Sequence, residues 1–261
     1  ITDEAISSAA SGSVIVQGGV SEKLSSLTPG SDYYVQADGS LAAGVTSIPY
    51  DISGATFVDA FSVSSQETSP QGLAFSTDGT KMFVAGASGD DVNEYALSTG
   101  FDISTASFTD AFSVAAQDTL PTGLAFNTDG TKMFVVGYTG QDINEYALTT
   151  GFDVSTASFT DAFSVAAQDT QPTSVAFNTD GTKMFVLGFT GDDVNEYALS
   201  TGFDVSTASF TDSFSVSAQD TGPTGLAFNT DGTKMFIAGD IGDSVYKYSL
   251  STGFDVSTAS F

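Results

Sequence analysis

The chain has 261 residues, and 41% of them are hydrophobic, which is enough apolar material to build a folded core. Its 32 acidic and 6 basic residues give a formal net charge of −26, which repels nucleic-acid phosphates and anionic lipids, so we expect no nucleic-acid partner and no direct membrane insertion. Histidine, cysteine, tryptophan and arginine are all absent. Their absence excludes Ser-His-Asp and Cys-His catalytic units, disulfides, and zinc sites that need imidazole or thiolate ligands.

The ends of the sequence carry no targeting signal that we can identify. No run of about 18 apolar residues is present, and the first residues lack the basic and apolar segments of a secretion signal. The sequence also begins without methionine. We therefore expect no transmembrane helix, and we interpret the sequence as a piece of a longer polypeptide or as a processed product.

Residues 1–50 differ from the rest of the chain and predict a small β module. Residues 13–19 indicate a strand that runs into a glycine turn, residues 27–31 indicate a turn, and residues 33–36 indicate a strand that ends at the Asp38-Gly39 pair. Residues 10–45 resemble a short module of bacteriophage tail and fibre proteins, in which residues 43–50 replace or shorten the last strand. The alternative is a β linker domain.

The remainder of the chain is organised around a segment that returns three times. Residues 77–84, Thr-Asp-Gly-Thr-Lys-Met-Phe-Val, recur almost unchanged at 128–135, 179–186 and 230–237, at a constant spacing of 51 residues. The Asp-Gly pair between two apolar runs predicts a tight β-hairpin, because glycine adopts positive φ without a steric clash. A unit of this length cannot bury its apolar faces alone, and a period near 50 residues with several short strands predicts a propeller.

Each repeat divides into four predicted strands, which in the second copy are residues 123–126, 132–137, 143–148 and 159–165. The last strand alternates apolar and polar residues, as a half-exposed strand does, whereas residues 133–136 are continuously apolar, as in a strand covered on both faces. This gradient from inner to outer strand predicts an all-β protein, a β-propeller of four-stranded blades. A β-solenoid is the alternative, although its coils are shorter and lack the tight hairpin.

The repeat boundaries predict four blades over residues 55–261. We place them at about 68–118, 119–169, 170–220 and 221–261, with an additional strand at 55–64. Residues 55–57 occupy the same phase of the repeat as residues 106–108 and 259–261. If the strand at 55–64 completes the last blade, the ring closes with four blades and no exposed edge; otherwise further repeats enlarge the ring.

A second resemblance concerns the blades themselves. Residues 121–126, Pro-Thr-Gly-Leu-Ala-Phe, and residues 129–135, Asp-Gly-Thr-Lys-Met-Phe-Val, resemble the blades of propellers with YVTN-type surface-layer repeats and of lactonase-like propellers. The resemblance covers about 200 residues and implies blade architecture; it does not imply an activity, because propellers host many unrelated functions. Enzymes of that group depend on a metal or histidine constellation in the central channel, which a chain without histidine cannot assemble.

Candidate binding residues lie on one predicted rim of the propeller. The loops from outer strand to next inner strand, and from second to third strand, fall on this rim, and the copies differ most there. Near-identical blades with variable loops indicate a scaffold that presents recognition residues, although drift at tolerant positions would look the same. The candidates are Leu120, Tyr138, Thr139, Gln171, Phe189, Thr190, Asp240 and Ile241.

The repeated charged residues are interpreted as structural. Asp90, Asp91, Asp192 and Asp193 are weak calcium candidates, but no stretch has the Asp-x-Asp-x-Asp-Gly spacing of a calcium loop, so we expect turn-forming roles and no cofactor. Carboxylates that recur in several blades, and one lysine in each hairpin, are also expected to be architectural and not catalytic. These residues are Glu94, Glu145, Glu196, Lys81, Lys132, Lys183 and Lys234.

The functional prediction combines the phage-like module with the missing catalytic residue types. We expect a protein that is not an enzyme, a phage tail fibre or surface appendage on the virion surface or otherwise extracellular, within a larger homo-oligomeric assembly. Its partners would be other virion or surface-structure proteins and a host-surface glycan or protein that binds the variable rim. The alternatives are a prokaryotic cell-surface adhesin or surface-layer protein and a carboxylate-dependent glycan-degrading enzyme.

Overall fold

The computed structural model describes residues 50–261 in full and, before them, the backbone of four short strands, β1 (Gly12–Val16), β2 (Gly19–Leu24), β3 (Tyr33–Val35) and β4 (Leu41–Ala43). The chain divides into two units, residues 1–56 and 57–261. In the first unit β1 pairs with β2 and β3 pairs with β4, both antiparallel, and a 3-10 turn, η1, spans Ile52–Gly54. The turns predicted at 27–31 and 38–39 lie outside the described residues. Within the described part of the chain, no helix is long and apolar enough to cross a membrane.

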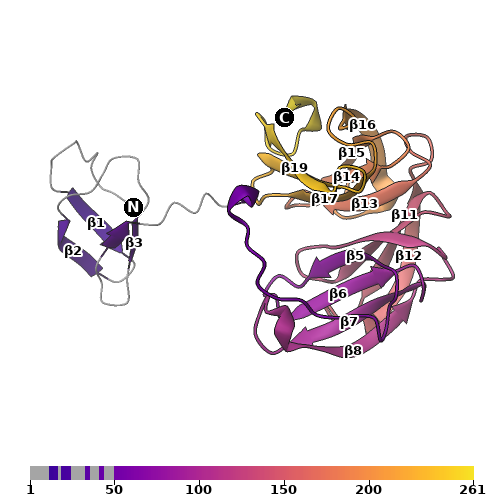
Figure 1. The fold of residues 1–261 in the computed structure, drawn as a ribbon, viewed down its shortest axis with the longest axis horizontal. Helices are drawn as coiled ribbons and strands as arrows, with labels where there is room; N and C mark the ends of the chain where they lie inside the picture. The colour runs from indigo at the N-terminus through magenta and orange to yellow at the C-terminus, as the bar shows by residue number, and fades with distance from the viewer. Residues whose placement is uncertain (1–11, 17–18, 25–32, 36–40, 44–49) are drawn as a thin grey trace. The chain divides into compact units, whose positions relative to one another are not determined.

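The second unit confirms the predicted all-β propeller of four blades, each a four-stranded antiparallel sheet (Figure 1). The strands follow the chain from the innermost to the outermost position of each blade. They are β5 (Pro70–Phe75), β6 (Lys81–Gly86), β7 (Asp91–Leu97) and β8 (Ala106–Ser113) in blade 1; β9 (Pro121–Phe126), β10 (Lys132–Gly137), β11 (Asp142–Leu148) and β12 (Ala157–Ser164) in blade 2; β13 (Pro172–Phe177), β14 (Lys183–Gly188), β15 (Asp193–Leu199) and β16 (Ala208–Ser215) in blade 3; and β17 (Pro223–Phe228), β18 (Lys234–Gly239), β19 (Ser244–Leu250) and β20 (Ala259–Ser260) in blade 4.

The Asp-Gly hairpins form because side chain and backbone cooperate in the same turn. In the first hairpin Gly79 has φ +70°, and the Oδ1 atom of Asp78 accepts hydrogen bonds from the backbone N–H of Thr80 at 3.0 Å and from its hydroxyl at 2.8 Å. A Cβ atom on Gly79 would also overlap the ring of Phe101, which lies directly over the turn. Glycine is therefore required here both for its positive φ and for this close approach.

A 3-10 turn connects the third strand of every blade to the fourth, and it too is set by an aspartate. In the second blade the Asp153 carboxylate accepts the backbone N–H of Ser155 and caps the turn. The residue before each cap, such as Phe152, has a positive φ. The turns are η2 (Ile103–Thr105), η3 (Val154–Thr156), η4 (Val205–Thr207) and η5 (Val256–Thr258).

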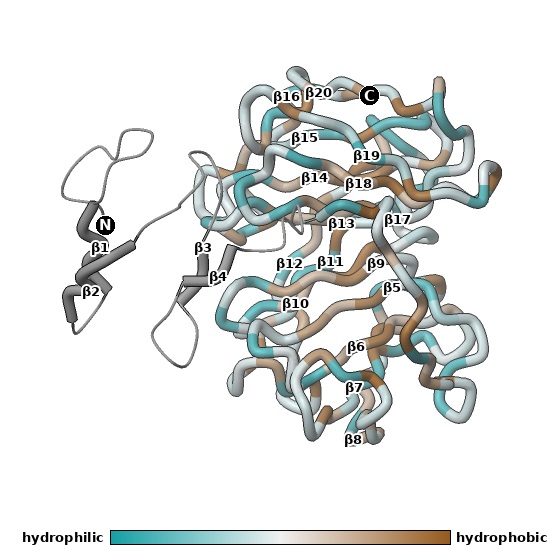
Figure 2. The backbone as a smooth tube through the Cα atoms, turned by 60° about the vertical axis from the view of Figure 1, so that its left-hand side comes forward, coloured by the Kyte–Doolittle hydropathy of each residue, from teal (hydrophilic) through white to brown (hydrophobic). Residues whose placement is uncertain are grey.

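The hydrophobic core lies between successive blades. The innermost strands lie side by side in the order β5, β9, β13 and β17, and Figure 2 shows apolar stretches of backbone along strands such as β6 and β9. Phe83 and Val92 of blade 1 pack in one cluster with Leu124, Met133 and Tyr146 of blade 2, and equivalent clusters join the next two pairs of blades. Residues 133–136 have no exposed surface, as their continuous apolar run predicts.

A charged contact also ties each blade to the next. The Lys81 ammonium lies 2.8 Å from Glu94 Oε1 and donates to the carbonyl oxygen of Phe152 in the next blade at 2.6 Å. The second carboxylate oxygen of Glu94 accepts the buried backbone N–H of Val154 at 3.0 Å. The same arrangement joins Lys132 and Glu145 to blade 3. These contacts agree with the architectural role that we expected for the repeated lysines and glutamates.

The segment predicted as a strand at 55–64 does not pair with the last blade in the described structure. There β19 pairs with β20, and residues 57–63 form no strand and pair with none. The ring of Phe61 instead lies edge-on against Tyr95 of blade 1, with 5.6 Å between ring centroids. In the described residues, this segment therefore does not close a four-blade ring. Such closure was one of the two alternatives that the repeat boundaries allowed.

Candidate functional site

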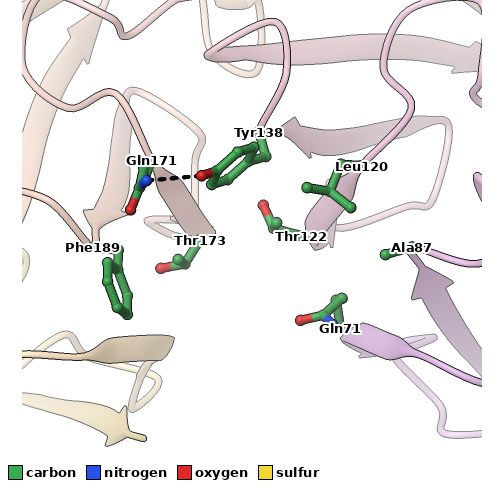
Figure 3. Close-up of a pocket in the computed structure, with 8 residues that line it drawn as sticks. All are labelled: Gln71, Ala87, Leu120, Thr122, Tyr138, Gln171, Thr173 and Phe189. Atoms are coloured by element: carbon green, nitrogen blue, oxygen red, sulfur yellow. Dashed lines mark hydrogen bonds between the residues drawn. The ribbon is translucent and has the colours of Figure 1, made fainter. Parts of the chain in front are cut away.

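The predicted rim carries a pocket of about 250 Å³ that spans the first three blades (Figure 3). Its residues come from the starts of the innermost strands and from the turns between second and third strands, which are the loops that the sequence placed on one rim. The lining residues are Gln71, Ala87, Leu120, Thr122, Tyr138, Gln171, Thr173 and Phe189. Four of the eight predicted binding residues, Leu120, Tyr138, Gln171 and Phe189, thus lie together.

Two buried aspartates hold the pocket loops in place. The Oδ1 atom of Asp118 accepts the backbone N–H of Leu120, and its Oδ2 atom accepts that of Gly140 two residues after Tyr138, both at 2.6 Å. The Tyr138 N–H donates to the carbonyl oxygen of Leu120 at 3.2 Å. One carboxylate therefore joins the two loops of blade 2 that contribute to the pocket.

Asp169 performs the same task in blade 3. It accepts the backbone N–H groups of Gln171 and Gly191, both at 2.6 Å, and so fixes the loops that carry Gln171 and Phe189. Its side chain approaches Gly188 so closely that a Cβ atom there would overlap the carboxylate. The glycine at the end of this strand is thus required by the aspartate that positions the pocket.

The pocket presents one hydroxyl proton whose direction is set by a neighbour. The Gln171 side-chain amide donates to the Tyr138 hydroxyl oxygen at 2.8 Å, as the dashed line in Figure 3 shows. Because the phenol oxygen accepts this bond, its own proton remains available for a second acceptor. The site can therefore donate a hydrogen bond from Tyr138 to an oxygen atom of a bound molecule.

Two threonines add hydrogen-bond acceptors. The Thr122 hydroxyl donates to the Pro172 carbonyl oxygen of the next blade at 2.9 Å. The Thr173 hydroxyl lies 3.2 Å from the Pro223 carbonyl oxygen and 3.3 Å from that of Leu187, so that each hydroxyl proton is directed toward a backbone carbonyl group. Their lone pairs can then accept from a water molecule or from a hydroxyl group of a ligand. The remaining wall is apolar, with Leu120 and Phe189, and no charged side chain lines the pocket.

The rim pocket adjoins a central cavity of about 220 Å³ between the innermost strands, with which it shares Gln71, Thr122 and Thr173. All four innermost strands line this cavity. Its wall includes Gly123, where a Cβ atom would overlap Val136 and the Thr173 carbonyl oxygen, so glycine lets the innermost strands of blades 2 and 3 approach closely. The two spaces together form the hollow nearest to the axis of the blades.

The other predicted rim residues lie outside the pocket. The hydroxyls of Thr139 and Thr190 lie 3.5 and 3.3 Å from those of Thr119 and Thr170, so each pair links two loops of its own blade. Asp240 and Ile241 belong to the corresponding turn of blade 4, where Ile241 is exposed, and neither lines the pocket.

The acidic turns that we considered for calcium are hydrogen-bonded within the turn. Asp91 and Asp193 each accept the side-chain amide of an asparagine two residues later, at 2.6 and 2.7 Å. Asp90 and Asp192 occupy positive-φ positions of the same turns. Among residues 50–261, no group of three or more carboxylates is placed to hold a metal ion.

Beside the pocket loops of blades 2 and 3, a buried carboxylate lies close to a half-buried one. Burial raises the pKa of Asp142, and the charge of nearby Asp118 raises it further; Asp193 is raised in the same way, by burial and then by Asp169. Asp118, Asp169, Thr122 and Thr173 were not among the site residues predicted from the sequence. The constant acid within each otherwise variable rim loop was the signal that could have found the two aspartates.

Comparison with known proteins shows the fold. No family model matches the chain, and no curated protein matches it. Two solved structures, each named "putative 6-phosphogluconolactonase", from Bacteroides uniformis and Bacteroides fragilis, are both 14% identical to it with TM-scores of 0.51 and 0.52. They match 85% and 87% of this chain and 60% and 61% of their own, so the chain spans about 60% of their length. A functionally unknown protein from Desulfotomaculum acetoxidans is 19% identical with a TM-score of 0.52 over 90% of this chain and 72% of its own.

These findings contradict our functional prediction of a non-enzymatic phage appendage. Two of the three structures, those from the Bacteroides species, carry the name of an enzyme, and none of the comparisons provides evidence for a phage tail module or a virion surface. The physical reasons are two. Turn-rich β segments such as residues 10–45 arise in many unrelated proteins, and the absence of histidine excludes imidazole chemistry without excluding ester hydrolysis that relies on hydroxyl and amide groups.

Proposed function

We propose that the chain is a lactonase-like hydrolase that opens an uncharged sugar lactone in the rim pocket. The fold that it shares with structures named as lactone hydrolases supports the proposal. The observation that carries it is the Tyr138 hydroxyl, whose oxygen accepts from Gln171 and whose proton is thereby available to a carbonyl oxygen in the pocket. An extracellular location belongs to the same proposal, and the acidic, cysteine-free composition is compatible with it.

The electrostatics of the chain favour a substrate without phosphate. The net charge of −26 and the absence of arginine repel an anionic group, and no lysine lines the pocket to offset this repulsion. The Phe189 ring and Leu120 offer an apolar surface for the C–H face of a sugar ring, while the Gln71 amide matches its hydroxyl groups. We therefore expect an unphosphorylated lactone to bind better than its phosphate ester.

The proposed reaction is addition of water to the lactone carbonyl. A water molecule held by the Thr122 and Thr173 oxygens attacks the carbonyl carbon, and the Tyr138 hydroxyl donates to the carbonyl oxygen as it gains negative charge. The ring C–O bond then breaks, the ring oxygen takes a proton from solvent, and the proton lost by the attacking water also passes to solvent. Because no basic side chain lines the pocket, this chemistry suits only activated cyclic esters.

The test is hydrolysis of D-glucono-1,5-lactone above its rate in buffer alone, with the 6-phosphate ester of the same lactone as a comparison. Tyr138→Phe keeps the ring and removes the donor, so we expect kcat/KM to fall by about 100-fold. Ile241→Ala changes an exposed residue of the same rim outside the pocket and should leave the rate unchanged. A wild-type rate equal to that of buffer, or an unchanged rate for Tyr138→Phe, contradicts the proposal.

A further inference from the structure

Residues 57–63 lie where the outermost strand of another blade would lie. Their sequence, Phe-Val-Asp-Ala-Phe-Ser-Val, matches Phe-Thr-Asp-Ala-Phe-Ser-Val of residues 108–114 in blade 1. In that blade the ring of Phe112 packs edge-on against Tyr146 of the next blade, with 5.5 Å between centroids and 78° between planes. Phe61 packs against Tyr95 with 5.6 Å and 78°. The segment thus contacts blade 1 as the outermost strand of a preceding blade would.

This segment differs from the complete outer strands in having no strand beside it. In blade 1, β8 pairs along its length with β7, from Leu97↔Ala106 to Asp91↔Ser113. Residues 57–63 pair with no strand within the described part of the chain. Phe57 is 85% exposed, whereas its equivalent Phe108 is 44% exposed. The place of a third strand beside residues 57–63 is therefore open to another strand.

The two end blades also expose residues that the inner blades bury. Val92, Ile143 and Val194, in the third strands of blades 1 to 3, are covered by the following blade and have no exposed surface, whereas Val245 in blade 4 is 51% exposed. In the innermost strands Leu73 of blade 1 is 61% exposed and its equivalent in blade 2 only 7%. Val245 in blade 4 and Leu73 in blade 1 are thus less covered than the equivalent residues of the inner blades.

We propose that residues 57–63, Leu73 and Val245 together form a docking surface for a three-stranded antiparallel β-sheet with the strand pattern of this repeat. Such a sheet would take residues 57–63 as its fourth strand, pack on Leu73 with one face and cover Val245 with the other. The innermost strands of blades 1 and 4 line the same central cavity, so that they border the same axis as the docked sheet would. This inference does not depend on the proposed function.

The three interfaces inside the chain specify this occupant. In each of them a phenylalanine of one blade packs against two of the next, such as Phe83 with Phe126 and Phe152 at 4.5 and 6.3 Å, and an apolar cluster surrounds them. A β-sheet of the same kind supplies both this packing and the main-chain hydrogen bonds that an unpaired strand accepts. A second complete copy of the chain fits less well. In its first three blades an outer strand already occupies the place that residues 57–63 would take, and one face of its blade 4 is already packed against blade 3.

The experiment combines the full chain with a separately produced polypeptide that has the sequence of residues 168–200, which contains β13, β14 and β15. We expect binding to slow amide hydrogen exchange in residues 57–63 by about tenfold or more, and to raise Tm by about 4 °C at saturating probe. A scrambled polypeptide of the same composition should do neither. The proposal would be overturned if the two polypeptides had equal effects, or if the polypeptide of residues 168–200 had none.

Variants of the full chain locate the surface. Val245→Asp places a charge where the docked sheet would bury an apolar group, and we expect it to weaken binding at least about tenfold. Ile241→Asp adds the same charge at an exposed rim residue of blade 4 outside the surface and should have no effect. If both variants weaken binding equally, the effect is one of charge alone and the proposed surface is wrong.

A fused version covers the case in which the polypeptide does not fold by itself. The sequence of residues 160–200 is appended after Phe261, so that the added strands follow blade 4 in the order of the repeat. The fused chain should resist proteolysis over the added segment and have a higher Tm than the fused Val245→Asp variant. Rapid cleavage of the added segment with an unchanged Tm would overturn the proposal.

Discussion

At the scale of single residues, one tyrosine hydroxyl distinguishes the first blade from the others. Tyr95, Tyr146, Tyr197 and Tyr248 occupy the same position in successive blades, and all four are fully buried. The last three donate to a glutamine in the preceding rim loop, at 3.3, 3.3 and 3.0 Å. Among the described residues the Tyr95 hydroxyl is the buried side-chain group without a hydrogen-bond partner. Its burial therefore carries an uncompensated cost.

This difference predicts opposite effects of the same substitution. Tyr146→Phe removes a hydrogen bond and leaves Gln117 without its donor, so the free energy of unfolding should fall by about 1 kcal/mol. Tyr95→Phe removes only an unsatisfied hydroxyl, so the free energy of unfolding should stay unchanged or rise by about 1 kcal/mol. Urea unfolding of both variants provides the measurement. Equal losses for the two would show that Tyr95 also has a partner in solution.

Aspartates of two kinds give stability a pH dependence of opposite sign. Hydrogen bonds from the hydroxyl and the backbone of Thr131 lower the pKa of Asp129 from its ordinary 3.8, so its contribution is present at neutral pH and is lost as pH falls below that value. Burial, with the charge of Asp118, raises the pKa of Asp142 above 3.8. The folded state therefore binds the Asp142 proton more tightly than the unfolded state does. As a result, the contribution of Asp142 to the free energy of unfolding falls as the pH rises above 3.8.

We therefore expect Asp142→Asn to raise the free energy of unfolding at pH 7, because an amide can still accept from Asn144 without carrying a buried charge. The gain should shrink at about pH 3, where the carboxyl group is protonated in both states. Asp129→Asn serves as the matched control and should lower stability at pH 7, with a smaller loss in acid. Unfolding curves of both variants at the two pH values measure whether each substitution raises or lowers the free energy of unfolding. A lower free energy of unfolding for Asp142→Asn at pH 7 would contradict the raised pKa of Asp142.

At the scale of elements, the blades are held together by a polar contact that repeats and then stops. Glu94, Glu145 and Glu196 each accept a buried backbone N–H from the 3-10 turn of the next blade. Blade 4 carries Lys247 at this position of its third strand, exposed to solvent. A lysine side chain cannot accept a hydrogen bond from such an N–H group. In a blade that packs on blade 4, the backbone N–H of the 3-10 turn would therefore need another acceptor.

Glu145→Ala tests this contact, because it leaves the Val205 N–H buried without an acceptor and the Lys132 ammonium without its carboxylate. We expect a loss of about 3 kcal/mol in the free energy of unfolding. Lys247→Ala changes the equivalent, exposed position of blade 4 and should stay within about 0.5 kcal/mol of the wild type. Chemical denaturation of the two variants is the measurement; similar values for both would show that the glutamate does not join the blades.

At the scale of the whole molecule, the net charge of −26 opposes the compact state. The inter-blade contacts include the ion pairs Lys81–Glu94, Lys132–Glu145 and Lys183–Glu196. With 32 acidic and 6 basic residues, however, most of the acidic groups have no cation to pair with. Repulsion of this kind acts over many ångströms and is reduced by dissolved ions. Stability should consequently respond to salt more than that of a protein with balanced charge.

We expect Tm to rise as the salt concentration is raised from about 0.01 M to 1 M, over which the screening length falls from about 30 Å to 3 Å. The control is the same titration near pH 4.1, the isoelectric point, where the net charge is small and the effect should largely disappear. Thermal unfolding followed by circular dichroism is sufficient. A salt response that is the same at both pH values would indicate a general effect of salt on the apolar core.

The repeat explains which residues of the pocket could be predicted from the sequence and which could not. Tyr138 and Phe189 stood out because they vary between near-identical copies, and the topology of a blade placed them on one rim. Thr122 and Thr173 could not be found in this way, because they belong to the constant part of the repeat and face the pocket only where three blades meet. The prediction of a phage appendage was wrong because it rested on a local resemblance and on absent residue types, neither of which specifies what a pocket binds.

The sequence by itself determined the strands, the hairpins and the blades, because glycine geometry and the two-residue period of a half-buried strand are local properties repeated every 51 residues. Only the tertiary structure decided which side chains share a pocket, which carboxylates hold its loops, and which strand and faces lack a neighbour. Those facts depend on how successive blades pack against one another. Contacts between blades join residues such as Tyr138 and Gln171 or Glu94 and Val154, which are tens of positions apart, where no local pattern can indicate them.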